Sequence, residues 1–155
     1  MRLCLQVIGD GSERQQLADM VTRLDLESMV QFAGFMRASA FAPLLAKSEI
    51  GFSPYCGRAE FSGLKLLDYK AAGLAVIASG AGGEPAVLDH GKTGWIVPPC
   101  DADSLAQAII TLAGDAVLRR KIGQAARLDA EAMHSWKHTA ATLLALFGTL
   151  PQVNS

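Results

Sequence analysis

A lysine and two carboxylates surround the predicted start of a helix. The stretch AEFSGLKLLDYKAAG covers residues 59–73 and places Glu60 before the helix, Lys65 in its first turn and Asp68 one turn later. A cation is disfavoured there because the open amides and the dipole of a helix N-terminus already present positive charge. A bound phosphate would remove this penalty, because it accepts hydrogen bonds from the amides and offsets the charge of the lysine.

Ser62 is the predicted N-cap of this helix, which leaves the amides of Gly63, Leu64 and Lys65 at its open end. Gly63 would let a bulky ligand approach the backbone. A surface ion pair between Lys65 and Asp68, worth under about 1 kcal/mol, is the alternative explanation of the spacing. From these residues alone, a binding site for a nucleotide sugar and a solvated loop are equally good interpretations.

Two glycine-containing loops follow predicted strands. The first, GDGS, resembles the opening of a dinucleotide fingerprint, but Arg14 occupies the position of the third glycine and the match fails. The second, AGFM, places a glycine between large apolar side chains, which suits contact with a flat base. An ordinary turn explains the first loop about as well and the second loop better. The candidate nucleotide contacts in these loops are Gly9, Gly11, Gly34, Phe35 and Met36.

Short apolar or β-branched runs alternate with helical stretches along the chain, which predicts an α/β fold. The predicted strands cover residues 3–8, 30–35, 50–53, 75–78 and 95–97. The predicted helices cover 12–26 with a Ser12/Gln15 capping box, 40–47, 63–72, 84–89, about 101–112 with Asp101 or Asp103 as cap, 118–133, and a stretch after Ser135. A parallel sheet with helices on both faces is the economical solution, because each parallel return needs a crossover.

Composition narrows the class of protein. A chain of 155 residues predicts one domain, and a formal net charge of -1 provides no field that would gather nucleic acid or an anionic membrane. The basic residues Arg119, Arg120, Lys121 and Arg127 are interpreted as a solvated helix face. No segment approaches the ~20 apolar residues of a membrane span. The first nine residues do not resemble a signal peptide, so a cytoplasmic location is expected.

Three cysteines, Cys4, Cys56 and Cys100, are odd in number and widely spaced. This spacing fits neither a zinc site nor a disulfide framework. The expectation is therefore that all three are buried or incidental thiols, and that the chain binds no metal through them.

The chain resembles the C-terminal, donor-binding half of the group 1 (family 4) retaining glycosyltransferases of GT-B fold. The resemblance rests on motifs in the family's order and spacing: VIGDGSERQQLADMV, VQFAGFM, IGFSPY, EFSGLKLLDYKAAGLAVIAS, GGEPAVLDHGKTGWIVPPCDADSLAQAI and SWKHTAATLLALF. It implies a Rossmann-like parallel sheet with helices on both faces, which is half of a GT-B fold. It also implies a nucleotide-diphosphate sugar as donor and transfer of a hexose to a glycan, lipid or other acceptor.

The resemblance assigns roles to the residues of the opening stretch. Glu60 corresponds to the first of two family carboxylates, which faces the donor sugar, and is the implied catalytic residue. Asp68 corresponds to the second, usually a glutamate, which holds the ribose hydroxyls. No metal or cofactor is implied, because basic groups and a helix terminus offset the charge of the leaving diphosphate. The implied donor-binding residues are Ser62, Gly63, Leu64, Lys65 and Asp68.

Two departures separate the chain from the family pattern. Asp68 is one methylene shorter than the usual glutamate, so a weaker or indirect ribose contact is expected. Ala86 stands where the family often has a glutamate after the proline, and Glu84 lies on the other side of Pro85.

The family's donor domain begins one strand and one helix earlier, with an arginine and a lysine that clamp the diphosphate. The resemblance therefore implies that residues 1–134 form an N-terminally truncated donor-binding domain. Residues 135–150 form a C-terminal helix that packs either on the domain's own core or on a partner domain, and residues 151–155 a disordered tail. An acceptor-binding N-terminal domain, or a separate chain, is the implied partner, and any peripheral membrane contact would pass through it.

The isolated chain is expected to bind nucleotide weakly and to transfer sugar poorly or not at all, because the clamp and the closing cleft are missing. Two alternatives remain at this stage. One is half of a sugar-nucleotide epimerase of similar fold. The other is a non-catalytic nucleotide-binding or interaction module that pairs through its apolar last helix.

Overall fold

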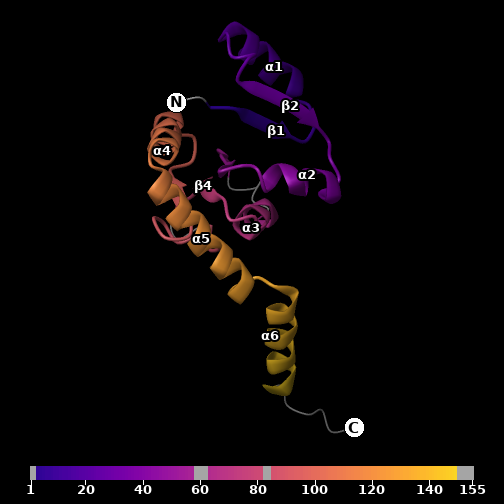
Figure 1. Ribbon diagram of the computed structural model, residues 1–155. Coiled ribbons are helices and arrows are strands. Elements are labelled where there is room, and N and C mark those ends of the chain that lie inside the picture. The colour runs from indigo at the N-terminus through magenta and orange to yellow at the C-terminus, as the bar shows by residue number, and fades with distance from the viewer. Residues whose placement is uncertain (1–2, 58–62, 82–84, 150–155) are drawn as a thin grey trace. The chain divides into compact units, whose positions relative to one another are not determined.

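The computed structural model describes residues 3–57, 63–81 and 85–149, and Figure 1 shows the order of their elements. The chain divides into two compact units, Met1–Lys47 and Ser48–Ser155, called here the N-terminal and C-terminal units. In the described part of the chain, no helix has the length and apolar character needed to cross a membrane. Each unit contains its own parallel sheet.

Two strands and two helices form the N-terminal unit. The strands β1 (Leu5–Ile8) and β2 (Val30–Gly34) pair in parallel, and α1 (Arg14–Arg23) makes the crossover that parallel pairing requires. The helix α2 (Ala38–Leu45) follows β2. Half-buried and exposed side chains alternate along β2, and no described residue of this unit is fully buried.

The C-terminal unit is centred on a three-stranded sheet in the order β3-β4-β5, of which Figure 1 labels the central strand β4. The strands β3 (Ile50–Ser53) and β5 (Trp95–Val97) both run parallel to the central strand β4 (Ala75–Ser79). All five residues of β4 are buried, as expected for a parallel strand that is covered on both faces.

Four helices belong to the C-terminal unit: α3 (Leu64–Ala71), α4 (Ala102–Gly114), α5 (Ala116–Met133) and α6 (Trp136–Thr149). Asp101 and Asp115 begin α4 and α5, because their carboxylates accept hydrogen bonds from amides of the first helical turn. The Ser104 hydroxyl and amide donate to Asp101 and hold the pKa of its carboxyl below the usual value. The prediction that Asp101 or Asp103 caps α4 is thus confirmed for Asp101.

Successive residues of β4 point to opposite faces of the sheet, and each face has its own apolar cluster. On one face, Ala75 and Ile77 pack with buried side chains of α4 and α5. On the other face, Val76 and Ala78 pack with the fully buried Leu66 of α3. The expected Rossmann-like arrangement, a parallel sheet with helices on both faces, is confirmed in this unit.

Glycines allow two close approaches around this sheet. A Cβ added to Gly51 of β3 would lie 2.5 Å from the ring of Tyr69 on α3. A Cβ added to Gly123 of α5 would overlap the carbonyl oxygen of Gly73, which follows α3. The position of α3 against the sheet and against α5 therefore depends on the absence of side chains at Gly51 and Gly123.

Two local predictions are wrong. The α1 helix begins after Glu13 and not at a Ser12/Gln15 capping box, because the Gln15 amide instead donates to Asp19, one turn along the helix, over 2.9 Å. Residues 85–89 form a turn, in which the Leu88 amide donates to the Pro85 carbonyl, and not the predicted helix.

Candidate functional site

The first turn of α3 presents backbone amides at its open end. Gly63 is the N-cap residue, with no side-chain capping bond, and the amides of Leu66 and Leu67 donate to its carbonyl over 3.1 and 3.2 Å. Those are the first hydrogen bonds of the helix. The amides of Leu64 and Lys65 precede them and have no recorded acceptor among the described residues. An anion placed at this end would meet both amides and the positive end of the helix dipole.

Lys65 and Asp68 are both exposed on α3. Within the described ranges, neither side chain takes part in a recorded ion pair, so the Lys65–Asp68 pair considered as an alternative does not form. The Lys65 charge therefore adds to the positive end of the helix, with no described carboxylate to offset it. Asp68 contributes to raising the pKa of the neighbouring Tyr69 hydroxyl, although burial of that ring is the larger cause.

Two of the predicted site residues, Glu60 and Ser62, lie outside the described residues. The role of Glu60 opposite a donor sugar stays a prediction. The assignment of Ser62 as N-cap is wrong, because Gly63 holds that position and the helix begins at Leu64. The shift moves the first helical amides by one residue, and Leu64 and Lys65 remain in the first turn.

The ends of the three parallel strands in the C-terminal unit are tied to one another. The Tyr55 amide, after β3, donates to the Ser79 hydroxyl at the end of β4 over 3.2 Å. The Cys100 amide, after β5, donates to the Tyr55 carbonyl over 3.4 Å. Since β3 and β5 lie on opposite sides of β4, these bonds connect all three carboxyl ends, where open α/β sheets bind their ligands.

A disulfide joins Cys56 to Cys100 across the same edge. The prediction that all three cysteines are lone thiols is wrong for this pair, while Cys4 is free and exposed. One signal could have found the bond: Cys56 and Cys100 each stand three residues beyond the end of a parallel strand, β3 and β5. The ends of parallel strands meet at one edge, so the 44-residue separation in sequence does not measure their separation in space.

Ser53 carries the one buried side-chain oxygen without a hydrogen-bond partner in the described part of the chain. It is the last residue of β3 and shares a sheet face with Gly51, which packs on Tyr69 of α3. A buried hydroxyl without a partner costs about 1–3 kcal/mol of stability.

The glycine loops of the N-terminal unit meet at one edge of their own sheet. The Gly9 amide, after β1, donates to the Gly34 carbonyl at the end of β2 over 2.8 Å. Both glycines have positive φ, of 131° and 68°, which favours glycine over other residues. Phe35 is 79% exposed and Met36 is half-buried. The structure therefore brings together Gly9 and Gly34 at the ends of β1 and β2, while the recorded bonds of Gly11 stay within its own loop.

A buried lysine near the other end of α3 was not found from the sequence. The Lys70 side chain is fully buried, donates to the Val87 carbonyl over 2.5 Å and forms an ion pair with Asp129 of α5. Asp129 is also 3.2 Å from His134 Nε2. The hydrogen bond from Lys70 lowers the pKa of the Asp129 carboxyl. The only sequence signal was the spacing of Lys70 four residues after Leu66, on one helix face.

Other concave surfaces lie away from these residues. A hollow of about 230 Å³ lies between β5 and α4, and one of about 340 Å³ lies beside Gly73 and Arg127. Neither is lined by residues 63–68. No group of three or more potential metal-ligating side chains occurs among the residues that the structure describes.

Comparison with known proteins gives consistent matches along the chain. Residues 2–129 match the family model described as glycosyl transferases group 1. The chain is 34% identical over 123 residues to N-acetyl-alpha-D-glucosaminyl L-malate synthase of Bacillus anthracis, which covers 79% of this chain and 31% of that protein.

Two solved structures are similar in fold. The first is the Anabaena protein HepE in complex with UDP, with a TM-score of 0.79 and 25% identity over 96% of this chain and 41% of that one. The second is the C-terminal domain of a group 1 family glycosyl transferase from Francisella tularensis, with a TM-score of 0.69 and 26% identity over 79% of this chain and 63% of that one. The chain spans about a third of the length of the curated relative from Bacillus anthracis.

Proposed function

Because the chain belongs to the group 1 glycosyl transferases, we propose that the N-terminus of α3 binds the diphosphate of a nucleotide-diphosphate sugar. The observation that carries this proposal is Lys65: it is exposed in the first turn, beside the open amide of Leu64, with no described carboxylate to neutralise it. A diphosphate would supply both the missing negative charge and the hydrogen-bond acceptors. The UDP complex of the similar Anabaena protein supports UDP as the first ligand to test.

The proposed reaction is retaining transfer of a hexose to a glycan, lipid or other acceptor, without a metal ion. Negative charge grows on the diphosphate as it leaves, and Lys65 and the α3 dipole stabilise that charge. In this proposal, Glu60 faces the donor sugar and Asp68 the ribose. The role of Gly34 and Phe35 beside the base stays a prediction from the family resemblance.

The acceptor site is proposed to belong to another domain or chain. The exposed apolar side chains of α6, such as Leu144 at 72% and Phe147 at 66%, support a role for this helix in contact with it. The proposed location is the cytoplasm. Transfer of sugar by the isolated chain is expected to be weak or absent, because stabilisation of the transition state needs a closed cleft. Robust transfer by the pure monomer would contradict this part of the proposal.

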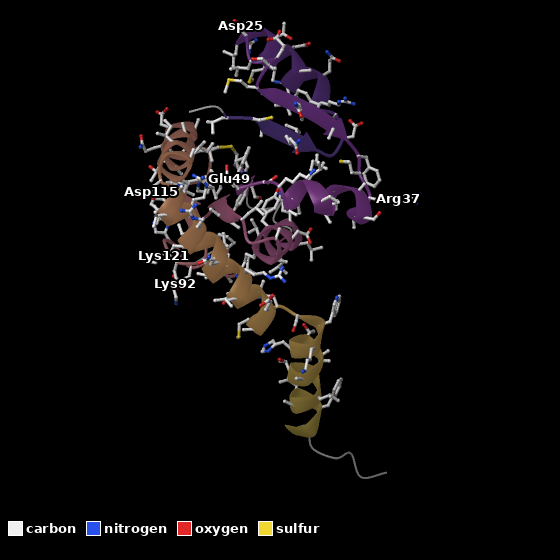
Figure 2. The ribbon with its side chains drawn as sticks, viewed as in Figure 1. Asp25, Arg37, Glu49, Lys92, Asp115 and Lys121 are labelled. Carbon is white, nitrogen blue, oxygen red and sulfur yellow. A yellow bond between two sulfur atoms is a disulfide. The ribbon has the colours of Figure 1, made fainter. Side chains whose placement is uncertain are left out.

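A thermal-shift titration with UDP, GDP, ADP and their glucose or mannose conjugates tests the donor site. A ligand at one hundred times its dissociation constant stabilises the fold by about 2.7 kcal/mol. Lys65→Ala should remove the shift. Lys121→Ala is the matched control, because Lys121 is an exposed lysine on α5 (Figure 2) that the proposal leaves outside the site. Equal shifts in both variants, or no shift with any nucleotide, would count against the donor site.

Two further variants separate the proposed roles. Glu60→Gln should leave the affinity for free UDP unchanged and weaken that for the sugar conjugate, whereas Asp68→Asn should weaken both through the ribose. Addition of EDTA should leave binding unchanged if no metal takes part. Analysis of the products of a longer protein that contains this chain would distinguish retaining transfer from epimerisation of the donor.

A further inference from the structure

Lys70 is the one charged residue among the fully buried residues that the structure describes. Its side chain has no exposed area, and it lies in the last turn of α3, on the same face as the buried Leu66. Removing an ammonium group from water costs several kcal/mol unless hydrogen bonds and an opposite charge compensate. The site of Lys70 supplies both.

The Lys70 ammonium connects three segments of the C-terminal unit. It belongs to α3, it donates to the carbonyl of Val87 in the turn after β4, and it pairs with Asp129 of α5. Asp129 is held in turn by His134 at the end of α5. The negative end of the α3 dipole adds a further favourable interaction, because Lys70 lies in the last turn. One buried group therefore fixes the mutual arrangement of α3, this turn and α5.

Stability alone does not account for a lysine at this position. Replacement of a buried ion pair by apolar side chains of similar volume is often neutral or stabilising. Apolar side chains are close at hand, because the Lys70 ammonium bonds to Val87, which packs on the cluster of Leu66, Val76 and Leu88. What an apolar side chain cannot supply is directional bonding to a carbonyl and a carboxylate at once.

Two of the three connected segments, α3 and the turn that contains Val87, lead to the candidate donor site. The first amides of α3 lie about two turns before Lys70 on the same rigid helix. The turn that contains Val87 belongs to the connection that leaves β4 at the carboxyl edge of the sheet. Any rotation or sliding of α3 against this turn would displace the amides and Lys65 together. Small displacements of this kind weaken a site whose donors must be held within about 0.5 Å.

We propose that Lys70 is a positioning residue, which holds the N-terminus of α3 in place for the donor diphosphate through its bonds to Val87 and Asp129. The inference rests on the proposed donor-binding function, and it concerns a residue outside the diphosphate contacts themselves.

The decisive variant is Lys70→Met, which keeps a long unbranched side chain, one atom shorter, and removes the directional bonds. We expect it to fold with a lower melting temperature, because Asp129 and the Val87 carbonyl lose their partner. It should bind UDP or its glucose conjugate about 3- to 30-fold more weakly. Leu112→Met is the matched control, since it places a methionine at another fully buried position, on α4. Its affinity for the nucleotide should equal that of the parent.

A second readout needs no ligand. Amide hydrogen exchange should be faster in Lys70→Met at Leu66, Leu67 and Leu88, whose amides bond within the tied segments, and unchanged at β4. Unchanged exchange at these amides, or faster exchange with parental affinity, would overturn the proposal. If the parent protein binds no nucleotide, the donor-site proposal fails, and the link from Lys70 to that site fails with it. The exchange data then still decide whether Lys70 holds α3 in place.

Asp129→Asn provides the second variant if Lys70→Met fails to fold. It keeps the lysine and weakens one of its two contacts, so the same amides should exchange faster and the affinity should fall by a smaller factor. A loss of melting temperature with neither change would assign the pair to the fold alone and overturn the positioning role.

Discussion

The two units of the chain use the same strand-helix-strand connection, but they bury their strand residues to very different extents. In the N-terminal unit, β1 and β2 pair across α1, and no described residue becomes fully buried. In the C-terminal unit, β4 has a strand on each side and helices on both faces, and all five of its residues are buried. Parallel strands are stable when both faces are covered, so only the second arrangement contains its own core.

This difference bears on the candidate site. The proposed diphosphate contacts begin α3, whose Leu66 and Lys70 are fully buried against the sheet and α5. The proposed base contacts, such as Phe35, stand on loops of the unit without an enclosed core. A chain segment of some 40 residues rarely supplies a core by itself. We therefore expect phosphate recognition to be rigid and base recognition to be the more adaptable part.

The largest expected effect comes from truncating one leucine in each unit. Leu112→Ala removes a side chain of 0% exposure from the cluster between α4, α5 and the sheet, and should lower the free energy of unfolding by about 2–5 kcal/mol. Leu17→Ala removes a side chain that is 44% exposed on α1, and should change it by less than about 0.5 kcal/mol. Denaturant unfolding measures both. Equal losses would contradict the contrast between the units.

Reduction of the Cys56–Cys100 disulfide should have the next largest effect. A dithiol breaks the sulfur–sulfur bond into two thiols and is itself oxidised, and both cysteines are exposed to it. Opening a loop of this length should cost about 2–4 kcal/mol of stability. Cys4→Ser, in the N-terminal unit, should leave this response intact, whereas Cys56→Ser should abolish it. A melting temperature that does not respond to the dithiol in the parent would refute the assignment.

Helix caps offer a smaller and closely matched contrast. The Asp115 carboxylate (labelled in Figure 2) accepts hydrogen bonds of 2.9 Å from the amides of Val117 and Leu118 at the start of α5. Asp115→Ala should therefore cost about 0.5–2 kcal/mol. Glu13 holds the same position on α1 without a capping bond, so Glu13→Ala should change stability only slightly. A larger loss from Glu13→Ala, measured by thermal unfolding, would reverse the comparison.

Local patterns in the sequence were sufficient for most of the fold. Each predicted strand is present, because strand runs are bounded by turn residues and depend on near neighbours. The start of α4 at Asp101 was likewise readable from one residue type. The error at Gln15 arose where two local interactions competed, whereas residues 85–89 form a turn closed by the Leu88 amide and the Pro85 carbonyl. The Gln15 side chain had both a capping bond and a partner at Asp19 within reach.

The contacts that shape the candidate site were not readable in this way. Lys70 and Asp129 lie 59 residues apart in the sequence, and only the packing of α3 against α5 brings them together. The disulfide likewise depends on which strands are neighbours of β4. Nor did the sequence indicate that the buried Ser53 hydroxyl would lack a partner in the described chain. Family resemblance could not supply these contacts either, because it carries roles only for residues that match a shared motif.

Titration of Asp129 gives the smallest expected effect and a test of the C-terminal unit alone. Its carboxyl pKa is lowered in the folded chain, chiefly by the hydrogen bond from Lys70, so the unfolded chain binds the proton more tightly. The stabilisation is therefore fully present above the unfolded value near 3.8 and is lost as the pH falls through the lower folded value. In Asp129→Asn, this part of the acid sensitivity should disappear, while that of Leu17→Ala should match the parent. Urea unfolding between pH 5 and pH 2.5, a range of about ±1.3 around the ordinary aspartate pKa, measures this acid sensitivity. Identical acid sensitivity of the parent and Asp129→Asn would show that Lys70 does not hold this carboxylate in its charged form.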